Sequence, residues 1–336
     1  MEGMNLNQLT IVIPTVNRLG LLRRALESAV AQTAPVRILV SDNGSSDGTL
    51  EFLEGFSHPR LVKKRLDQTI SSQDHARLLH QWVDTDWAVF LSDDDYLEPD
   101  FAARIIAHHD AHPECAIIYT RAWVHIWDAH YAGKAGPAVE EGCDFMMEFL
   151  RGHREPCWCA MALRMEDLRR IGPQPPDRHI GDMYYWIRIL TDHKIGCVPE
   201  PLAHYLYASD EVKNTTSGIA LRDWYRESML QADEMIHAAQ GCGRHGDRSV
   251  GELRRMRTQF VARSCANQII WNRIRGRNAS TLLCESWTCA RVFAATPIVW
   301  LRVVGALLLP KRWVSAGVAR YVEKVLSKGN PSHPIV

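Results

Sequence analysis

Hydrophobic and polar positions follow two alternating periods over the first 120 residues. Short apolar runs of the kind that form buried strands occupy residues 9–13, 36–40, 87–91 and 115–120. Between them, apolar residues recur with helical spacing over residues 20–31, 49–56, 71–83 and 99–111, and the polar run 61–66 predicts a peripheral strand. Strands that alternate with crossover helices predict an α/β fold, with a mostly parallel sheet flanked by helices.

The pattern changes twice further along the chain. Residues 121–215 are less regular and rich in Trp, Cys, His and Pro, whereas residues 216–336 return to helical periodicity, over 221–239, 250–274 and 282–294. We therefore expect two halves of an α/β domain, residues 1–120 and 121–215, followed by a helical C-terminal extension.

The tail contains an apolar run at residues 298–309. It is 12 residues long and contains Arg302, whereas about 20 residues are needed to span a bilayer. Its flanks carry Arg291, Lys311, Arg312 and Trp313. Two interpretations stay open: a helix lying on an anionic membrane surface, or a helix packed on the core or on a second subunit.

Composition limits the partners and the cellular location expected for the protein. Lys and Arg number 39, as do Asp and Glu, so the formal charge is zero and nothing indicates a nucleic-acid partner. The first residues lack a basic segment followed by an apolar one, so we expect no secretory signal. The nine cysteines show no zinc-ligand spacing and are expected to be reduced. These features predict a cytoplasmic protein, located at the inner face of the membrane if the tail docks there.

Three consecutive carboxylates, Asp93, Asp94 and Asp95, follow the apolar run 87–91. Like charges this close repel, and burial beside a sheet increases the repulsion. A divalent cation removes the repulsion, and hard oxygen ligands suit Mg²⁺ or Mn²⁺ with phosphate oxygens and water. A loop that caps the following helix is the alternative. Because ligands of such sheets bind beyond the carboxyl ends of strands, we favour a metal site.

A second turn, residues 42–49, follows the apolar run 36–40, and residues 14–18 follow the first strand. Together they predict a rim on the same edge of the sheet. A carboxylate there, such as Asp42, can accept the N3–H of uracil, which cytosine lacks. Guanine offers an N1–H, so the argument favours UDP without excluding GDP.

In this order, the segments IVIPTVNR, LVSDNGSSDGT and VFLSDDDYLEPDF resemble those of family 2 glycosyltransferases, which have the GT-A (Rossmann-like) fold. The resemblance covers about residues 8–210. It implies an inverting, metal-assisted transfer of a sugar from a nucleotide sugar to the hydroxyl of a glycan or lipid-linked glycan, in surface polysaccharide or glycan biosynthesis. Residues 1–120 would then bind the nucleotide sugar and residues 121–215 the acceptor.

The resemblance also implies roles for individual residues. Asp93 would reach the ribose, Asp94 would ligate the metal, and Asp95 would assist it or fix the loop. Arg77 would support the carboxylates that bind the nucleotide. The expected nucleotide-binding residues are Pro14, Thr15, Asn17, Arg18, Ser41, Asp42, Arg77 and Asp93.

An inverting transfer also needs a base that takes the proton of the acceptor hydroxyl. The resemblance implies a carboxylate at the start of a helix after a flexible segment. Asp182 fits this description, and Asp177 is the second choice. Trp158 either stacks on a sugar of the acceptor or belongs to the core. His204 either reaches the diphosphate or the metal, or is a buried or surface histidine without a role in the site. Lys213 either neutralises phosphate or is a solvated surface lysine.

Two other functions stay open. A nucleotidyltransferase shares this type of sheet but generally has a glycine-rich basic loop after the first strand, which residues 14–19 lack. A nucleotide-sugar-binding scaffold without activity is the other alternative, and the retained aspartates argue against it.

Overall fold

The computed structural model describes residues 8–126, 129–208, 219–245 and 248–321. Within these residues a single sheet has the strand order β3-β2-β1-β4-β9-β6-β10-β5, with β7 paired to β6 and β8 paired to β10. The strands are β1 (Leu9–Thr15), β2 (Arg37–Asp42), β3 (Leu61–Arg65), β4 (Trp87–Phe90), β5 (Tyr96–Leu97), β6 (Cys115–Ile126), β7 (Ala129–Ala132), β8 (Val139–Glu141), β9 (Met161–Arg164) and β10 (Lys194–Ala208).

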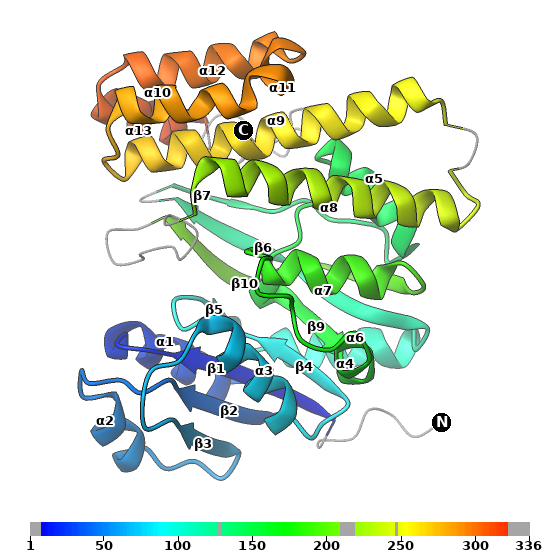
Figure 1. Cartoon of the computed structure of the whole chain (residues 1–336). Helices are drawn as coiled ribbons and strands as arrows, with labels where there is room; N and C mark the ends of the chain where they lie inside the picture. The colour runs from blue at the N-terminus through cyan, green and yellow to red at the C-terminus, as the bar shows by residue number, and fades with distance from the viewer. Residues whose placement is uncertain (1–7, 127–128, 209–218, 246–247, 322–336) are drawn as a thin grey trace.

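Strand directions place several loops on one edge of this sheet. Strands β3, β2, β1 and β4 run parallel, β6 and β10 run parallel, and β9 is antiparallel to both β4 and β6. Because β4 and β6 both oppose β9, the carboxyl ends of β1, β2, β4, β6 and β10 reach the same edge. The expected α/β fold with a mostly parallel sheet flanked by helices is confirmed (Figure 1).

Two layers of helices cover the sheet. The apolar stripe of α1, with Leu22 and Leu26, packs with Ile11 and Ile13 of β1, whereas Val12 packs into the core on the other face. Alternation along β1 therefore supplies both cores. The first layer contains α1 (Leu19–Val30), α2 (Thr49–Gly55) and α4 (Phe101–Ala111), and the second contains α3 (Ser72–Trp82), α5 (Gly142–Arg151), α6 (Met165–Ile171) and α7 (Gly181–Leu190).

The C-terminal helices lie together over the part of the sheet that carries β6, β7 and β10 (Figure 1). They are α8 (Leu221–Gly241), α9 (Val250–Ile274), α10 (Ala279–Ser286), α11 (Ala290–Ala294), α12 (Pro297–Leu308) and α13 (Lys311–Tyr321). Phe260 of α9 packs on Phe149 of α5, with ring centroids 5.7 Å apart. None of the helices in the described ranges combines the length and apolar character needed to cross a bilayer.

The expected boundary after residue 120 falls inside β6, so the two expected halves of the α/β domain share one continuous sheet. Their assignment to donor and acceptor stays a prediction. The long strand β10 was not predicted. Its pairing with β6 shifts register between Val198 and Pro201, where prolines interrupt the ladder and the apolar pattern.

Candidate active site

The acidic loop after β4 spreads its carboxylates in different directions. Asp93 is buried, and its Oδ2 accepts a hydrogen bond from Thr15 Oγ1 at 2.8 Å. Arg18 Nη1 lies 2.9 Å from Asp93 Oδ1 and 3.1 Å from Asp94 Oδ2. Burial raises the pKa of Asp93, and the charge of Arg18 opposes that rise. The loops after β1 and β4 are thus joined by one guanidinium.

Asp95 points into the protein. Its Oδ1 accepts a hydrogen bond from the backbone N–H of Leu206 on β10 at 2.8 Å, and the thiol of Cys159 is a second partner. Burial raises the pKa of Asp95 well above its usual range. This carboxyl therefore fixes the acidic loop to β10, which is one of the two roles expected for it.

Asp94 is the carboxylate of this loop that suits a metal. It is partly exposed, and its Oδ1 has no hydrogen-bond or ion-pair partner within the described residues. Magnesium usually binds through one or two carboxylates, with substrate phosphates and water completing the octahedron. The chemistry of Asp94 fits such a site, whereas the inward direction of Asp95 does not fit a second ligand.

The loops after β1 and β2 form the expected rim. Asn17 adopts a positive φ of 52°, and its N–H donates to Ser45 Oγ at 2.8 Å. Its Oδ1 accepts from the backbone N–H of Ser46 at 2.7 Å. Gly44, with φ of 73°, lies so close to the backbone of residues 68–69 that a Cβ would come within 2.7 Å of it. Pro14 pairs with Ser41 across the two strands, so the structure brings these predicted residues together.

Asp42 is held inside the turn after β2. Its side chain is 0% exposed, and its oxygens bind the backbone N–H of Ser45 and the guanidinium of Arg65. Ser41 is also buried and shares a hydrogen bond of 2.6 Å with His75 Nε2. The Asp42 carboxylate thereby holds the turn, and its contact with a uracil N3–H stays a prediction.

Arg77 has no hydrogen bond or ion pair with the site carboxylates within the described residues, and its expected role stays a prediction. It lies on α3, 54% of its side chain is exposed, and its ion pair is with Asp74 on the same helix. The arginines that contact the buried carboxylates are Arg65 and Arg18, which sequence reasoning did not assign to that task. Contacts between separate loops carry no local signal, so the sequence alone does not distinguish these three arginines.

Asp182 lies in the first turn of α7. Its Oδ1 accepts a hydrogen bond from the backbone N–H of Met183 at 2.8 Å, and burial raises its pKa. The buried Cys157 thiol and Tyr205 hydroxyl both have raised pKa values, mainly through burial, with further contributions from the charges of Asp95 and Asp182. Both groups therefore lie within electrostatic reach of the acidic loop and of Asp182.

Arg178 positions the segment before α7 and was not recognised from the sequence. The buried guanidinium binds Glu227 at 2.7 Å and Glu234 at 2.7 Å, both on α8. The prolines and the glycine of this segment had indicated a flexible loop. Arg178 instead ties the segment to the C-terminal helices. Asp177, the second choice for a base, is 59% exposed and pairs with Arg226.

Three further residues have simpler explanations. Trp158 stacks on Phe90 with ring centroids 5.8 Å apart and packs against the core, which favours the core alternative over an acceptor contact. His204 bonds His125 through Nδ1 and Glu98 through Nε2. Both ring nitrogens of His204 are thus occupied. Lys213 lies outside the described residues.

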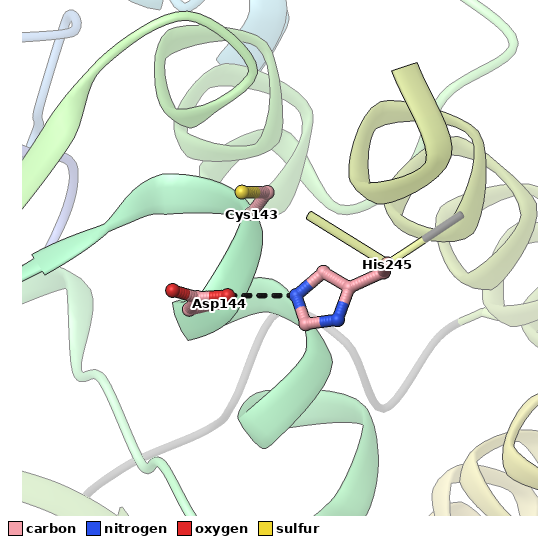
Figure 2. A group of neighbouring side chains, drawn as sticks. All are labelled: Cys143, Asp144 and His245. Atoms are coloured by element: carbon pink, nitrogen blue, oxygen red, sulfur yellow. Dashed lines mark ion pairs between the residues drawn. The ribbon is translucent and has the colours of Figure 1, made fainter. Parts of the chain in front are cut away.

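Another group of potential metal ligands lies at the opposite edge of the sheet. Cys143, Asp144 and His245 place one ligand atom each within 4.8 Å of one another (Figure 2). Asp144 pairs with His245 at 2.7 Å and with Arg244 at 2.9 Å. A carboxylate already neutralised by a guanidinium is a poor cation ligand, so this group is an ion-pair network that joins α5 to the end of α8.

Comparisons with known proteins identify the family and the fold. The family described as Glycosyl transferase family 2 matches residues 10–155. Proteins called "PGL/p-HBAD biosynthesis glycosyltransferase" in Mycobacterium bovis and Mycobacterium tuberculosis are 30% identical over 218 residues, covering 63% of this chain and 78% of theirs.

Solved structures share the fold at low sequence identity. S. aureus TarS 1-349 in complex with UDP-GlcNAc has a TM-score of 0.60 at 14% identity, covering 94% of this chain and 87% of that one. The mannosyltransferase PcManGT of Pyrobaculum calidifontis, in complex with GDP-Man and Mn²⁺, has a TM-score of 0.53 at 14% identity, covering 94% and 88%. These likenesses extend over the C-terminal helices as well as the sheet.

Proposed function

This chain belongs to glycosyl transferase family 2, and from that membership we propose that it transfers a sugar from a nucleotide sugar to an acceptor hydroxyl, with inversion at the anomeric carbon. The observation that carries the proposal is the group formed by Arg18, Asp93 and Asp94 at the carboxyl edge of the sheet, with Asp182 on the acceptor side. The acceptor is a glycan or a lipid-linked glycan in surface polysaccharide or glycan biosynthesis.

The donor side is the end of the site at β1, β2 and β4. Asp94 would hold a divalent cation, Mg²⁺ or Mn²⁺, which as a Lewis acid stabilises the negative charge that develops on the leaving diphosphate. Arg18 lies beside Asp94 and can donate to phosphate oxygens from the same place. Asp93, held by Thr15, is positioned to accept from a ribose hydroxyl.

The acceptor side supplies the base. Asp182 takes the proton of the acceptor hydroxyl while that oxygen attacks the anomeric carbon. The bond from this carbon to the diphosphate oxygen breaks, and its electron pair leaves with the nucleoside diphosphate. Burial raises the pKa of Asp182, which makes its carboxylate a stronger proton acceptor at neutral pH.

The identity of the nucleotide is a further part of the proposal. A UDP-sugar is favoured, because TarS, whose fold is similar, was solved with UDP-GlcNAc and with UDP. A GDP-sugar is the alternative, because PcManGT was solved with GDP-Man. Because the Asp42 side chain is buried beside Arg65, backbone groups of the rim would also take part in selecting the base.

A donor screen tests this function. The full chain is incubated with UDP-, GDP- and TDP-sugars, with Mg²⁺ or Mn²⁺, and free nucleotide is measured with and without EDTA. We expect metal-dependent release of nucleoside diphosphate from a UDP-sugar. Release of pyrophosphate would instead indicate a nucleotidyltransferase, and no release from any donor would indicate a binding scaffold.

The exposed face of α12 is proposed as a membrane contact. Ile298, Leu301 and Leu308 are each more than two thirds exposed and project to one side of the helix at 3.6 residues per turn. Arg302 and Lys311 lie exposed beside them, which suits an anionic surface. The double substitution I298E/L301E should abolish flotation with vesicles of phosphatidylglycerol and phosphatidylcholine. A dimer that the same substitution dissociates would instead identify this face as a subunit interface.

A further inference from the structure

A cavity of ≈ 350 Å³ lies between the carboxyl ends of β6 and β10 and the helices α8, α9 and α13. Its size falls in the range of about 300–1,000 Å³ typical of small-molecule sites. Most of its wall is apolar, and eight of its lining side chains are aromatic, among them Phe149, Tyr207, Trp224, Phe260 and Trp271. Such a wall suits an aryl or alkyl group and is unlike the polar grooves that bind extended glycans.

The cavity adjoins the proposed base. Ile180 and Met183, on either side of Asp182 in the sequence, line it, and so do Cys157 and Tyr205. The latter two are the buried groups on which the charges of Asp95 and Asp182 both act. A molecule held in the cavity would therefore present its end to the catalytic edge of the sheet.

One charge in the cavity wall lacks a counter-ion. Arg263 of α9 donates to the backbone carbonyl of Leu150, and no carboxylate in the described ranges pairs with it. The other charged side chains in the wall are Arg154, which binds Glu140 through two hydrogen bonds of 2.7 and 2.9 Å, and Glu155, whose Oε1 accepts from Tyr131 while its buried Oε2 has no hydrogen-bond partner within the described residues.

A buried cation without a partner destabilises the folded protein. Burial lowers the pKa of Arg263 to about 10, so the side chain stays charged at neutral pH. Its position gives the cavity an amphiphilic character, with a large apolar surface and one positive charge that no carboxylate within the described residues pairs with.

We propose that this cavity binds the non-sugar part of a lipid-linked acceptor, an amphiphile with an aryl or alkyl body and one anionic group, a carboxylate or phosphate, that pairs with Arg263. The hydroxyl that receives the sugar lies at the end directed to Asp182. That the ligand is a sugar acceptor rests on the proposed transferase function. The chemical class of the ligand rests on the residues that line the cavity.

Binding and turnover are measured separately with one pair of probes. Hydroxyphenylhexanoate and its neutral methyl ester are titrated against the full chain by tryptophan fluorescence, and nucleotide release from the donor is followed with and without each probe. The wild type should bind the carboxylate about 10- to 100-fold more tightly than the ester, the range expected for one charge-assisted hydrogen-bonded pair. Equal affinity for the two probes would overturn the proposal.

Arg263→Met should remove this preference while leaving the affinity for the ester unchanged. Because it removes an uncompensated charge, it should leave the melting temperature equal or higher. Arg154→Met is the matched control: it leaves Glu140 without its partner and should lower the melting temperature, but it should keep the preference for the carboxylate. A loss of stability in Arg263→Met without a change of preference would show a purely structural arginine.

A second variant tests the location of the site. Asn267→Phe, on the same wall of α9, fills the cavity and should weaken both probes together. Unchanged binding of both would place the ligand elsewhere and overturn the proposal. If the carboxylate binds through Arg263 but no donor yields nucleotide, the transferase function fails while the ligand class holds.

Discussion

Replacing Asp182 by Asn isolates the proposed base from its structural surroundings. Asn keeps the Oδ1 acceptor for the N–H of Met183, so the first turn of α7 loses little, less than the roughly 1 kcal/mol of a lost capping side chain. The amide cannot take a proton at neutral pH. Loss of a general base typically slows transfer by about 10²- to 10⁴-fold, which corresponds to roughly 3–5 kcal/mol in the activation barrier.

The assay compares the turnover number, the KM for the donor and the melting temperature of the same variant. Donor KM and melting temperature should barely change. Asp177→Asn is the control, because Asp177 is exposed and pairs with Arg226 at the surface, and it should retain full turnover. If Asp182→Asn keeps its turnover, or if Asp177→Asn loses it, Asp182 is not the base.

The pH profile adds a second readout. A base acts only when it is deprotonated, so the rate falls as the pH falls through its pKa. Burial raises the pKa of Asp182. As the pH falls, the wild type should therefore lose activity at a higher pH than an enzyme whose base is an exposed aspartate. Asp182→Asn should lack this acidic limb. A wild-type profile flat through the acidic range would contradict a buried carboxylate base.

Other predictions concern the metal, the loop before α7 and the acceptor side. Asp94→Asn should reduce metal-dependent turnover by about 100-fold or more, whereas Asp95→Asn should stay within about 10-fold of the wild type, since the Asp95 side chain points to the backbone of β10; nucleotide release with a Mn²⁺ titration separates them. Arg178→Met should destabilise the protein by about 3–5 kcal/mol in urea unfolding, because it leaves Glu227 buried without its partner. Burial raises the pKa of Glu155 from 4.5 to about 7, so the folded state binds this proton more tightly and stability should decline by up to about 3 kcal/mol as the pH rises between those values; in Glu155→Gln that decline should be absent.

Local patterns in the sequence were sufficient for the first half of the fold. Apart from the two-residue strand β5, the strands and helices from β1 to α4 lie where the sequence pattern predicts them, because each element buries a face defined by its own residues. The polar edge strand β3 is also where it was expected. By contrast, β9 is only four residues long and β10 contains Pro199 and Pro201, so neither has a recognisable period.

The site shows the same division. The acidic loop and the turn after β2 could be placed at one edge from strand order alone, and Asn17 and Arg18 do join them. Which carboxylate faces solvent depends on packing between distant segments. Asp42 is closed off by Arg65, and Asp95 by the backbone of β10.

The cavity has no local sequence signature at all. Its wall combines residues from Val124 on β6 to Tyr321 on α13, and it exists only because the C-terminal helices cover the sheet. The isolated charge of Arg263 is likewise invisible until its surroundings are known.

The most direct test of the central claim is the anomeric configuration of the product. The full chain is supplied with a UDP-sugar, Mn²⁺ and an acceptor, and the product is examined by proton NMR alongside quantification of UDP. We expect one glycoside per UDP released, with the anomeric configuration opposite to that of the donor, and no product from Asp182→Asn. A glycoside that retains the donor's configuration would contradict a single displacement assisted by Asp182.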